Sequence, residues 1–443
     1  MIKHNIKTTK NKINRDGKED SLKLDLTGYK NSQTETQKMP LNISLVIDCS
    51  GSMASGIDGN FAFSASPILA NFKGVEEKPN TEFLSKIEMA KKSALRFVET
   101  LDDKDFLSLV VFGDKSHVVL ESSIMNKDNK NKAKKIIENQ INPDKGMTNL
   151  YDGWVDGVKE VTSTMRKDAL NRVIVLTDGQ LNRGETNPKS IKDSVLKMYD
   201  AAISTTTFGI GEDFNEDLLQ MMSYSGGGNA YYINDRSTFE SFIDEEITGI
   251  TNIVAKNIRL SMEFSKNFSE SHLVNDAFEK DEKGYFIVPS LRKEQTQPMI
   301  FNLVYSNVKG KKSTKVATLK IEYTNEDNEI ISIEETLKVD VCEQNEWDKL
   351  EFNKDVIVEK ELMEISKLKN KARDFMDQGD ILKAKETIQS ISQSSLADYD
   401  DNLYKDETNK MNNLIASMEN SNSYGSVRKM MSYESYNTQR GKS

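Results

Sequence analysis

The chain contains 443 residues, which is enough for about three domains of ordinary size. Its formal net charge is -10, so a nucleic-acid backbone would be repelled unless basic residues gathered on one face, and the only basic run lies at residues 3–15. No segment approaches the ~20 consecutive apolar residues of a membrane helix, and the basic run is not followed by the apolar part of a signal peptide. We therefore expect a cytoplasmic protein that binds no nucleic acid and does not span a membrane.

The N-terminal segments come before the first regular pattern. Residues 1–20 are basic and interleaved with Asn and Thr, and we expect them to be disordered. Leu22, Leu24 and Leu26 then alternate with polar residues, which is typical of a half-buried strand. The α/β pattern that follows begins with a strand of its own, so we assign residues 21–40 to a β domain formed later in the chain.

From residue 43 to about residue 250, short apolar segments alternate with helical ones. This order predicts βα crossovers and an open, doubly wound, mostly parallel sheet covered by helices on both faces. The expected strands are residues 43–48, 106–112, 117–121, 173–177, 205–210 and 230–233.

The first of these strands ends in an unusual motif, Asp48-Cys49-Ser50-Gly51-Ser52. Alternation along the turn places the carboxylate and the two hydroxyls on one side. Such hard, mostly neutral oxygen donors suit Mg²⁺ or Mn²⁺ better than zinc. The motif therefore predicts one part of a metal site.

Two further segments offer the missing donors. Thr148 adds a hydroxyl within residues 146–149, and Asp178 directly follows the strand at 173–177. The carboxyl ends of parallel strands form the binding crevice of an open sheet, so residues far apart in sequence can meet there.

The order Asp-x-Ser-x-Ser, then Thr, then Asp resembles the metal-ion-dependent adhesion site of von Willebrand factor A (vWA) domains, whose sheet is Rossmann-like. The resemblance implies a cation, Mg²⁺ or alternatively Mn²⁺ or Ca²⁺, held directly or through water by Asp48, Ser50, Ser52, Thr148 and Asp178. Such a donor set leaves the ion incompletely neutralised and with a replaceable coordination position. We therefore expect a protein partner that supplies an Asp or Glu to the ion.

The pattern changes after residue 254. Runs at residues 258–264, 285–288, 299–305, 315–323 and 329–339 alternate with no helix between them, which is typical of an antiparallel β-sandwich. We predict that a vWA domain at residues 41–254 is inserted in a sandwich built from residues 21–40 and 255–345. A similar layout occurs in bacterial vWA proteins of this general type.

Helical spacing returns after Trp347. We assign residues 350–419 to a helical hairpin region, with helices at 362–376 and 381–391 and a third at 403–418. One hairpin is too short for a solenoid, so we expect it to pack on the sandwich or on a partner. Residues 420–443 are rich in Ser, Tyr and Asn with few aliphatics, and we expect a disordered tail.

Two segments of the vWA region have two interpretations each. The loop at residues 54–79 contains several Phe and Ile residues, and it either forms an interaction hot spot beside the metal or folds onto its own domain. The helix at 238–250 is either static or shifts when the metal site is occupied, as the matching helix can in the family.

Enzymatic chemistry finds little support in the sequence. Phosphate-loop, zinc-protease and serine-hydrolase motifs are absent, and the two cysteines are too few for a disulfide framework. Cys49 has no histidine near it in sequence, so we interpret it as a small buried residue.

These observations favour a non-enzymatic, Mg²⁺-dependent protein-binding module that acts as an adaptor or assembly factor. A regulatory subunit of a separate AAA+ ATPase is an alternative, since vWA proteins often serve such machines. A surface adhesin is a second alternative, because it uses the same metal chemistry.

Overall fold

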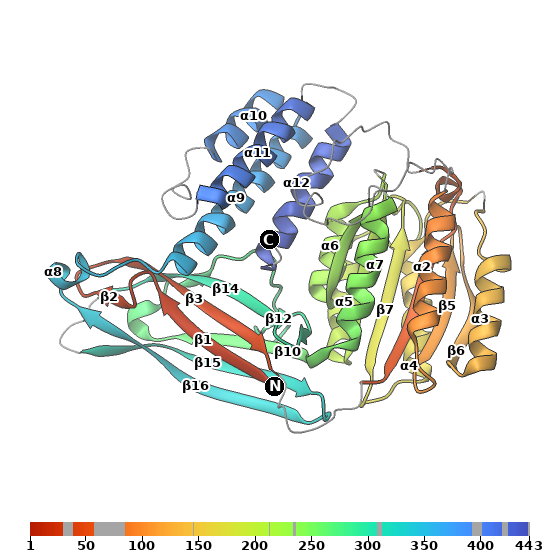
Figure 1. Cartoon of the computed structure of the whole chain (residues 1–443), viewed down its shortest axis with the longest axis horizontal. Helices are drawn as coiled ribbons and strands as arrows, with labels where there is room; N and C mark the ends of the chain where they lie inside the picture. The colour runs from red at the N-terminus through yellow and green to blue at the C-terminus, as the bar shows by residue number, and fades with distance from the viewer. Residues whose placement is uncertain are drawn as a thin grey trace. The chain divides into compact units, whose positions relative to one another are not determined.

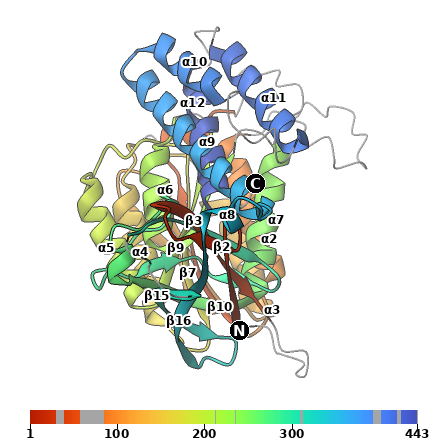
Figure 2. The same ribbon diagram turned by 90° about the vertical axis from the view of Figure 1, so that its left-hand side faces the viewer.

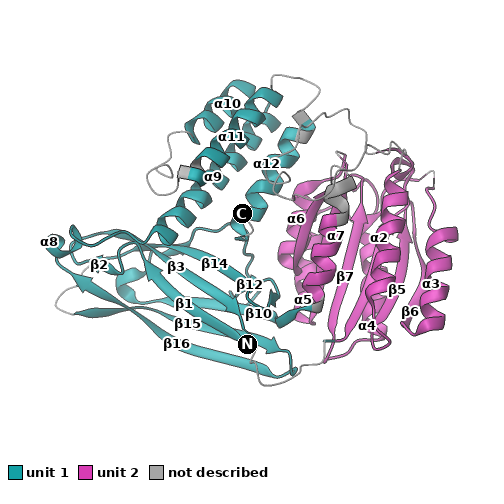
Figure 3. Ribbon diagram, in the orientation of Figure 1, with its two compact units in different colours: residues 1–39, 252–443 teal, residues 40–251 magenta. Residues whose placement is uncertain are grey.

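The computed structural model describes residues 1–29, 39–56, 85–144, 146–211, 213–233, 236–306, 308, 312–391, 401–418 and 424–441. The chain divides into two compact units: unit 1 combines residues 1–39 and 252–443, and unit 2 comprises residues 40–251 (Figure 3). Unit 2 therefore interrupts unit 1 in sequence. Unit 2 begins one residue before the predicted start of the insertion, residue 41, and ends three residues before its predicted end, residue 254.

Unit 2 contains a six-stranded sheet in the order β6-β5-β4-β7-β8-β9, parallel except for β6. Every residue of β4, β7 and β8 is buried, as expected for parallel strands covered on both faces. The predicted open α/β sheet is confirmed. Its strands are β4 (Leu41–Asp48), β5 (Phe106–Phe112), β6 (Ser116–Ile124), β7 (Leu170–Thr177), β8 (Ile203–Ile210) and β9 (Gly227–Ile233).

Helices cover this sheet, as Figure 1 shows. They are α2 (Lys86–Thr100), α3 (Lys127–Gln140), α4 (Leu150–Ser163), α5 (Pro188–Asp200), α6 (Glu216–Ser225) and α7 (Arg236–Thr251). Helix α4 packs on β4, β5 and β7. It approaches β4 closely because Gly157 has no side chain; a Cβ there would lie 2.5 Å from Val46 Cγ2.

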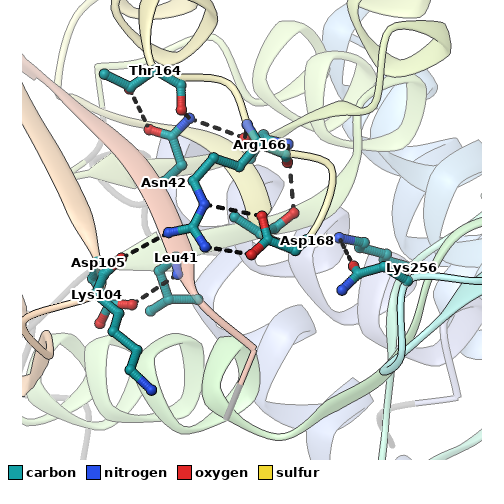
Figure 4. A network of polar contacts seen from close by, with 11 residues as sticks. Leu41, Asn42, Lys104, Asp105, Thr164, Arg166, Asp168 and Lys256 are labelled. Carbon is teal, nitrogen blue, oxygen red and sulfur yellow. Dashed lines mark hydrogen bonds and ion pairs between the residues drawn. The ribbon is translucent and has the colours of Figure 1, made fainter. Parts of the chain in front are cut away.

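A polar network fixes the amino end of β4, opposite the predicted metal site (Figure 4). The carboxylate of Asp105 accepts a hydrogen bond from the backbone N–H of Leu41 at 2.8 Å. Asn42 donates to the Asn171 side chain of β7 at 2.9 Å and accepts from the Thr164 hydroxyl at 3.1 Å. These bonds help to set the register of β4 and β7, so the carboxyl ends of the two strands lie side by side.

Unit 1 is built around two sheets, with strand orders β1-β3-β14-β11 and β12-β10-β15-β16-β2, whose pairings are antiparallel except that β2 runs parallel to β16. The predicted pairing of residues 21–27 with the later β domain is confirmed, because β3 pairs with β14 along nine residues and places Leu24 opposite Met299. The strands are β1 (Ile2–Thr8), β2 (Lys12–Asn14), β3 (Glu19–Gly28), β10 (Ile253–Phe264), β11 (His272–Leu273), β12 (Phe286–Val288), β13 (Leu291–Arg292), β14 (Thr296–Val304), β15 (Ser313–Asn325) and β16 (Ile330–Cys342).

The expectation that residues 1–20 are disordered is wrong. Strand β1 pairs with β3 over its whole length, and β2 pairs with β16. Lys7, Lys12 and Arg15 form ion pairs with acidic residues more than 300 positions later in the chain. The basic side chains therefore have counter-charges in the folded unit, and the strands add to an existing sheet.

The helical part of unit 1 contains α8 (Gln344–Trp347), α9 (Lys354–Asp377), α10 (Ile381–Ser390), α11 (Asp401–Met418) and α12 (Tyr424–Gln439), seen from the side in Figure 2. Gly379, with φ of +77°, forms the turn between α9 and α10. Helix α9 also contacts β3 and β14, so the helices pack on the sandwich. Among the described residues, no helix combines the length and apolar character needed to cross a membrane.

The prediction of a disordered tail at residues 420–443 is also wrong, because α12 packs along α9. Val427, Met431 and Tyr436 are buried, and the side chains of Ser435 and Ser366 each donate to the other's backbone carbonyl, at 3.1 and 3.3 Å. Small serines let the two helices approach closely, so few aliphatic residues are sufficient to hold α12.

A buried lysine ties three of these helices together. The Lys369 ammonium of α9 lies 2.9 Å from a carboxylate oxygen of Glu407 on α11 and 2.7 Å from one of Glu434 on α12. Burial opposes the charge on Lys369, but the two carboxylates outweigh it and raise its pKa.

Candidate metal centre

The candidate site begins where β4 ends. Asp48 is fully buried, and its Oδ1 accepts a hydrogen bond from the backbone N–H of Ser50 at 2.8 Å. Its Oδ2 accepts one from the Thr177 hydroxyl at 2.5 Å. The short 3-10 helix Gly51–Ala54 then turns the chain back. Asp48 is therefore held from both its own loop and the neighbouring strand β7.

The two serines connect Asp48 to the second carboxylate. Ser50 Oγ and Ser52 Oγ lie 3.1 Å apart, and Ser52 Oγ donates to Asp178 Oδ1 at 2.8 Å. Asp178, directly after β7, is also fully buried. Four of the predicted ligands thus form a continuous set of oxygen atoms.

Thr148, just before α4, lies beside the residue that follows Asp178. A Cβ added to Gly179 would be 2.7 Å from Thr148 Oγ1, so the hydroxyl directly adjoins the residue after Asp178. Asn182 fixes Thr148 by accepting from its backbone N–H at 2.8 Å and donating to its carbonyl at 3.3 Å. All five predicted ligands therefore gather at the carboxyl ends of β4 and β7.

Burial dominates the electrostatics of the loop. It raises the pKa of Asp48 to about 6, although hydrogen bonds from Ser50 and Thr177 act in the opposite direction. It also raises the pKa of the neighbouring Cys49 thiol to about 12, with the charge of Asp48 as a smaller cause. Cys49 is 5% exposed, in agreement with its interpretation as a small buried residue.

Besides Asn182, two residues that contact the carboxylates of the site were not predicted. Thr177 donates a hydrogen bond to Asp48. The sequence could have predicted this contact, because β4 and β7 are adjacent strands that both end at this edge of the sheet. Lys86 is the second: its ammonium lies 2.8 Å from Asp178 Oδ2. Lys86 follows the long segment after Ser52 in the sequence, so no spacing rule points to it.

The chemistry of this donor set fits a hard divalent cation. Two carboxylates and three hydroxyls converge, and two fully buried carboxylates are costly without positive charge beside them. Lys86 supplies one positive charge against two negative ones. Within the described part of the chain, no cluster of three or more His, Cys, Asp and Glu side chains is suited to a metal, so the hydroxyls are needed for any ion held here.

The sequence left two interpretations open for each of two segments of unit 2, the loop at residues 54–79 and the last helix. Residues 57–84, which include most of the predicted 54–79 loop, lie outside the described residues. The predicted helix at 238–250 is part of α7. Its buried Glu246 accepts hydrogen bonds from Arg172 at 2.7 Å, and from Thr206 and Tyr231 at 2.9 Å each. These bonds hold α7 on the sheet.

The open α/β sheet, with acidic and hydroxyl side chains at the carboxyl ends of its central strands, defines a domain of the doubly wound class. Residues 42–245 match the family model described as von Willebrand factor type A domain. The chain therefore contains a vWA domain, which lies within unit 2.

Relatives with this domain are found in bacteria and animals. YfbK of Escherichia coli K12 is 27% identical over 212 residues, which are 45% of this chain and 36% of that protein. Human inter-alpha-trypsin inhibitor heavy chain H3 is 26% identical over 241 residues, 52% of this chain and 23% of that protein. The chain thus covers about a third of the length of the Escherichia coli protein and about a quarter of the length of the human one.

Two solved structures extend the likeness to almost the whole chain. A von Willebrand factor type A protein from Catenulispora acidiphila has a TM-score of 0.66 at 13% identity, covering 94% of this chain and 89% of that one. The ArnB paralog VWA2 from Sulfolobus acidocaldarius has a TM-score of 0.55 at 18% identity, covering 100% and 98%. At these identities the likeness concerns the fold alone.

Proposed function

We propose that Asp48, Ser50, Ser52, Thr148 and Asp178 form a metal-ion-dependent adhesion site that binds Mg²⁺, with Mn²⁺ or Ca²⁺ as substitutes. The observation that carries this proposal is the continuous set of oxygen atoms around two fully buried carboxylates, whose charge exceeds that of Lys86. Hydroxyl and carboxylate oxygens are the ligands that Mg²⁺ prefers.

When bound, such an ion offers a replaceable coordination position that accepts an anionic oxygen. A pair of unit charges 4 Å apart is worth about 4 kcal/mol at an effective dielectric of 20, whereas a neutral hydrogen bond contributes about 1 kcal/mol net. An Asp or Glu side chain of a protein partner is therefore the ligand that we propose. The protein would act as a cytoplasmic adaptor or assembly factor.

The surface beside Thr148 gives this site a second means of selection. Met147 is 47% exposed, and Asp114 accepts from its backbone N–H at 2.8 Å. The Arg183 guanidinium lies 3.0 Å from the same Asp114 carboxylate. A partner with an apolar residue and a second acidic group near its metal-binding carboxylate would complement this rim.

A non-enzymatic role agrees with the local chemistry. The Cys49 thiol is kept protonated by burial, and His117 lies on the exposed side of the edge strand β6. Both carboxylates of the site are engaged by hydroxyl groups of the same loop and strand. These contacts suit the positioning of a cation.

Calorimetry with MgCl₂ on the full chain tests the metal site, and pull-down with Mg²⁺ or EDTA tests the partner. We expect Asp48→Ala to stay folded and to lose both Mg²⁺ binding and the EDTA-sensitive partners. Asp103→Ala, which removes an exposed carboxylate of the same unit, is the matched control and should behave like the parent protein. Unchanged Mg²⁺ binding in Asp48→Ala, or retention of every partner, would contradict the proposal.

A further inference from the structure

Lys86 is a buried cation at the proposed metal site. It is the first residue of α2, directly after Ser85, whose side chain accepts from the Glu88 N–H and caps the helix. The side chain of Lys86 is 5% exposed and that of Asp178 is 0% exposed, and their charged atoms lie 2.8 Å apart. A fully buried carboxylate thus already has one cationic partner within the chain.

The backbone places this lysine where the metal-binding loop ends. The N–H of Lys86 donates to the Ser55 carbonyl at 3.0 Å, and Gly56 forms an isolated β-bridge with Ser85. The loop that carries Ser52 and the start of α2 are therefore joined. As a result, Ser52 binds one oxygen of Asp178 and Lys86 binds the other.

A second carboxylate lies within reach of the same ammonium. Asp213 Oδ2 is 3.9 Å from Lys86 Nζ, and the side chain of Asp213 is 78% exposed. The end of the Lys86 side chain lies against Gly211, where a Cβ would be 2.9 Å from Lys86 Cε and 3.1 Å from its Nζ. The glycine leaves room for the end of the lysine beside both acids.

We propose that Lys86 competes with the divalent cation for Asp178 and transfers to Asp213 when the ion binds. Lys86 thereby sets the affinity of the site for its metal. This inference rests on the proposed metal site. Its physical basis is that Asp178 has two oxygens, both already used by the chain, so an ion that takes up the carboxylate must weaken one of these contacts.

The charges give the direction of the effect. Asp48, Asp178 and Lys86 together carry a net charge of -1 in the site, and a divalent ion changes this to +1. Without the lysine the same ion would bring the net charge of the site to zero, so the ammonium opposes ion binding. Once the ion is present, the retained positive charge strengthens attraction for an acidic partner. The lysine therefore lowers metal affinity and adds to partner affinity.

Calorimetric titration of the full chain with MgCl₂, and separately with MnCl₂, tests the competition. We expect Lys86→Met to bind either ion at least about tenfold more tightly, because an opposing charge is gone. Lys86→Arg retains the charge and should stay close to the parent protein. Lys92→Met is the matched control, since Lys92 is exposed on the same helix, and it should leave ion affinity unchanged.

A double-mutant cycle tests the transfer to Asp213. Asp213→Asn removes the second partner of Lys86, so we expect severalfold weaker ion binding. In the Lys86→Met background the same substitution should have almost no effect, because no ammonium is left to transfer. An equal loss in both backgrounds would mean that Asp213 acts only through its own charge, and it would overturn the transfer.

Melting temperatures give an independent readout. In EDTA, Lys86→Met leaves Asp178 buried without its ion pair and should melt several degrees lower than the parent protein, and saturating Mg²⁺ should more than restore it. Unchanged ion affinity in a folded Lys86→Met would overturn the competition while leaving the metal site intact. Absence of ion binding by the parent protein and by every variant would overturn both proposals.

Discussion

The substitution Glu246→Ala tests how firmly α7 is held on the vWA sheet. Arg172 and Glu246 form an ion pair at 2.7 Å with side chains that are 3% and 0% exposed. Removal of one partner from a buried pair typically costs about 3–5 kcal/mol, because the other charge stays buried and uncompensated. Domains are stable by only about 5–15 kcal/mol, so this change removes a large share of the stability of unit 2.

Urea denaturation followed by circular dichroism measures this loss, and hydrogen exchange locates it. We expect faster exchange in α7 and in β8, which carries Thr206, another donor to Glu246. Glu245→Ala is the matched control, because Glu245 is the adjacent residue and the Tyr231 hydroxyl reaches it only at 3.4 Å. It should cost less than about 1 kcal/mol.

A double replacement separates the ion pair from packing. Arg172→Met combined with Glu246→Leu removes both charges and should recover much of the stability lost in Glu246→Ala. The reasoning is refuted if Glu246→Ala costs less than about 1 kcal/mol, or if exchange in α7 does not change. Hydrogen exchange in α7 that increases on addition of Mg²⁺ would instead show that the helix moves with site occupancy.

Three further predictions follow from other contacts. Lys369→Met should lower the free energy of unfolding of unit 1 by about 3–5 kcal/mol at neutral pH. Burial raises the pKa of Glu407, but the charge of Lys369 helps to lower it below the ordinary glutamate value of 4.5. The stability difference between Lys369→Met and the parent protein should therefore shrink as the pH falls below 4.5. A difference that does not change with pH would contradict this reasoning. Gly179→Ala should weaken Mg²⁺ binding measured by calorimetry, because its Cβ would lie 2.7 Å from Thr148 Oγ1, and unchanged affinity would count against the role of Thr148. Deletion of residues 424–443 should lower the melting temperature by several degrees, since it uncovers buried faces of α9, and an unchanged transition would mean that α12 does not dock.

Local patterns were sufficient for the strands of the vWA sheet and for the meeting of the candidate residues at the carboxyl ends of those strands. The apolar runs that precede Asp48 and Asp178 form adjacent central strands, so the ends of those runs meet at one edge of the sheet. The pairing of residues 21–27 with the sandwich also followed from simple alternation, because the α/β domain that comes next in the chain already begins with a strand of its own.

Contacts between distant residues were beyond the sequence. Lys86 reaches Asp178 because Gly56 bridges Ser85, and nothing in the spacing between them signals this closure. The basic N-terminus is ordered because its counter-charges lie more than 300 residues away. Helix α12 is held by buried serines as well as apolar groups. Its segment is rich in Ser, Tyr and Asn with few aliphatics, and such a composition is by itself typical of disordered chains.

The interrupted sandwich has a consequence for how the chain is made. Strand β3 finds its partner β14 only after more than 250 further residues have been synthesised, whereas all strands of unit 2 are complete by residue 233. The vWA domain can therefore fold on the ribosome while β1 and β3 still await the rest of their sheet. During that interval the N-terminal strands leave one sheet edge unpaired, and an unpaired edge is a site where nascent chains can associate.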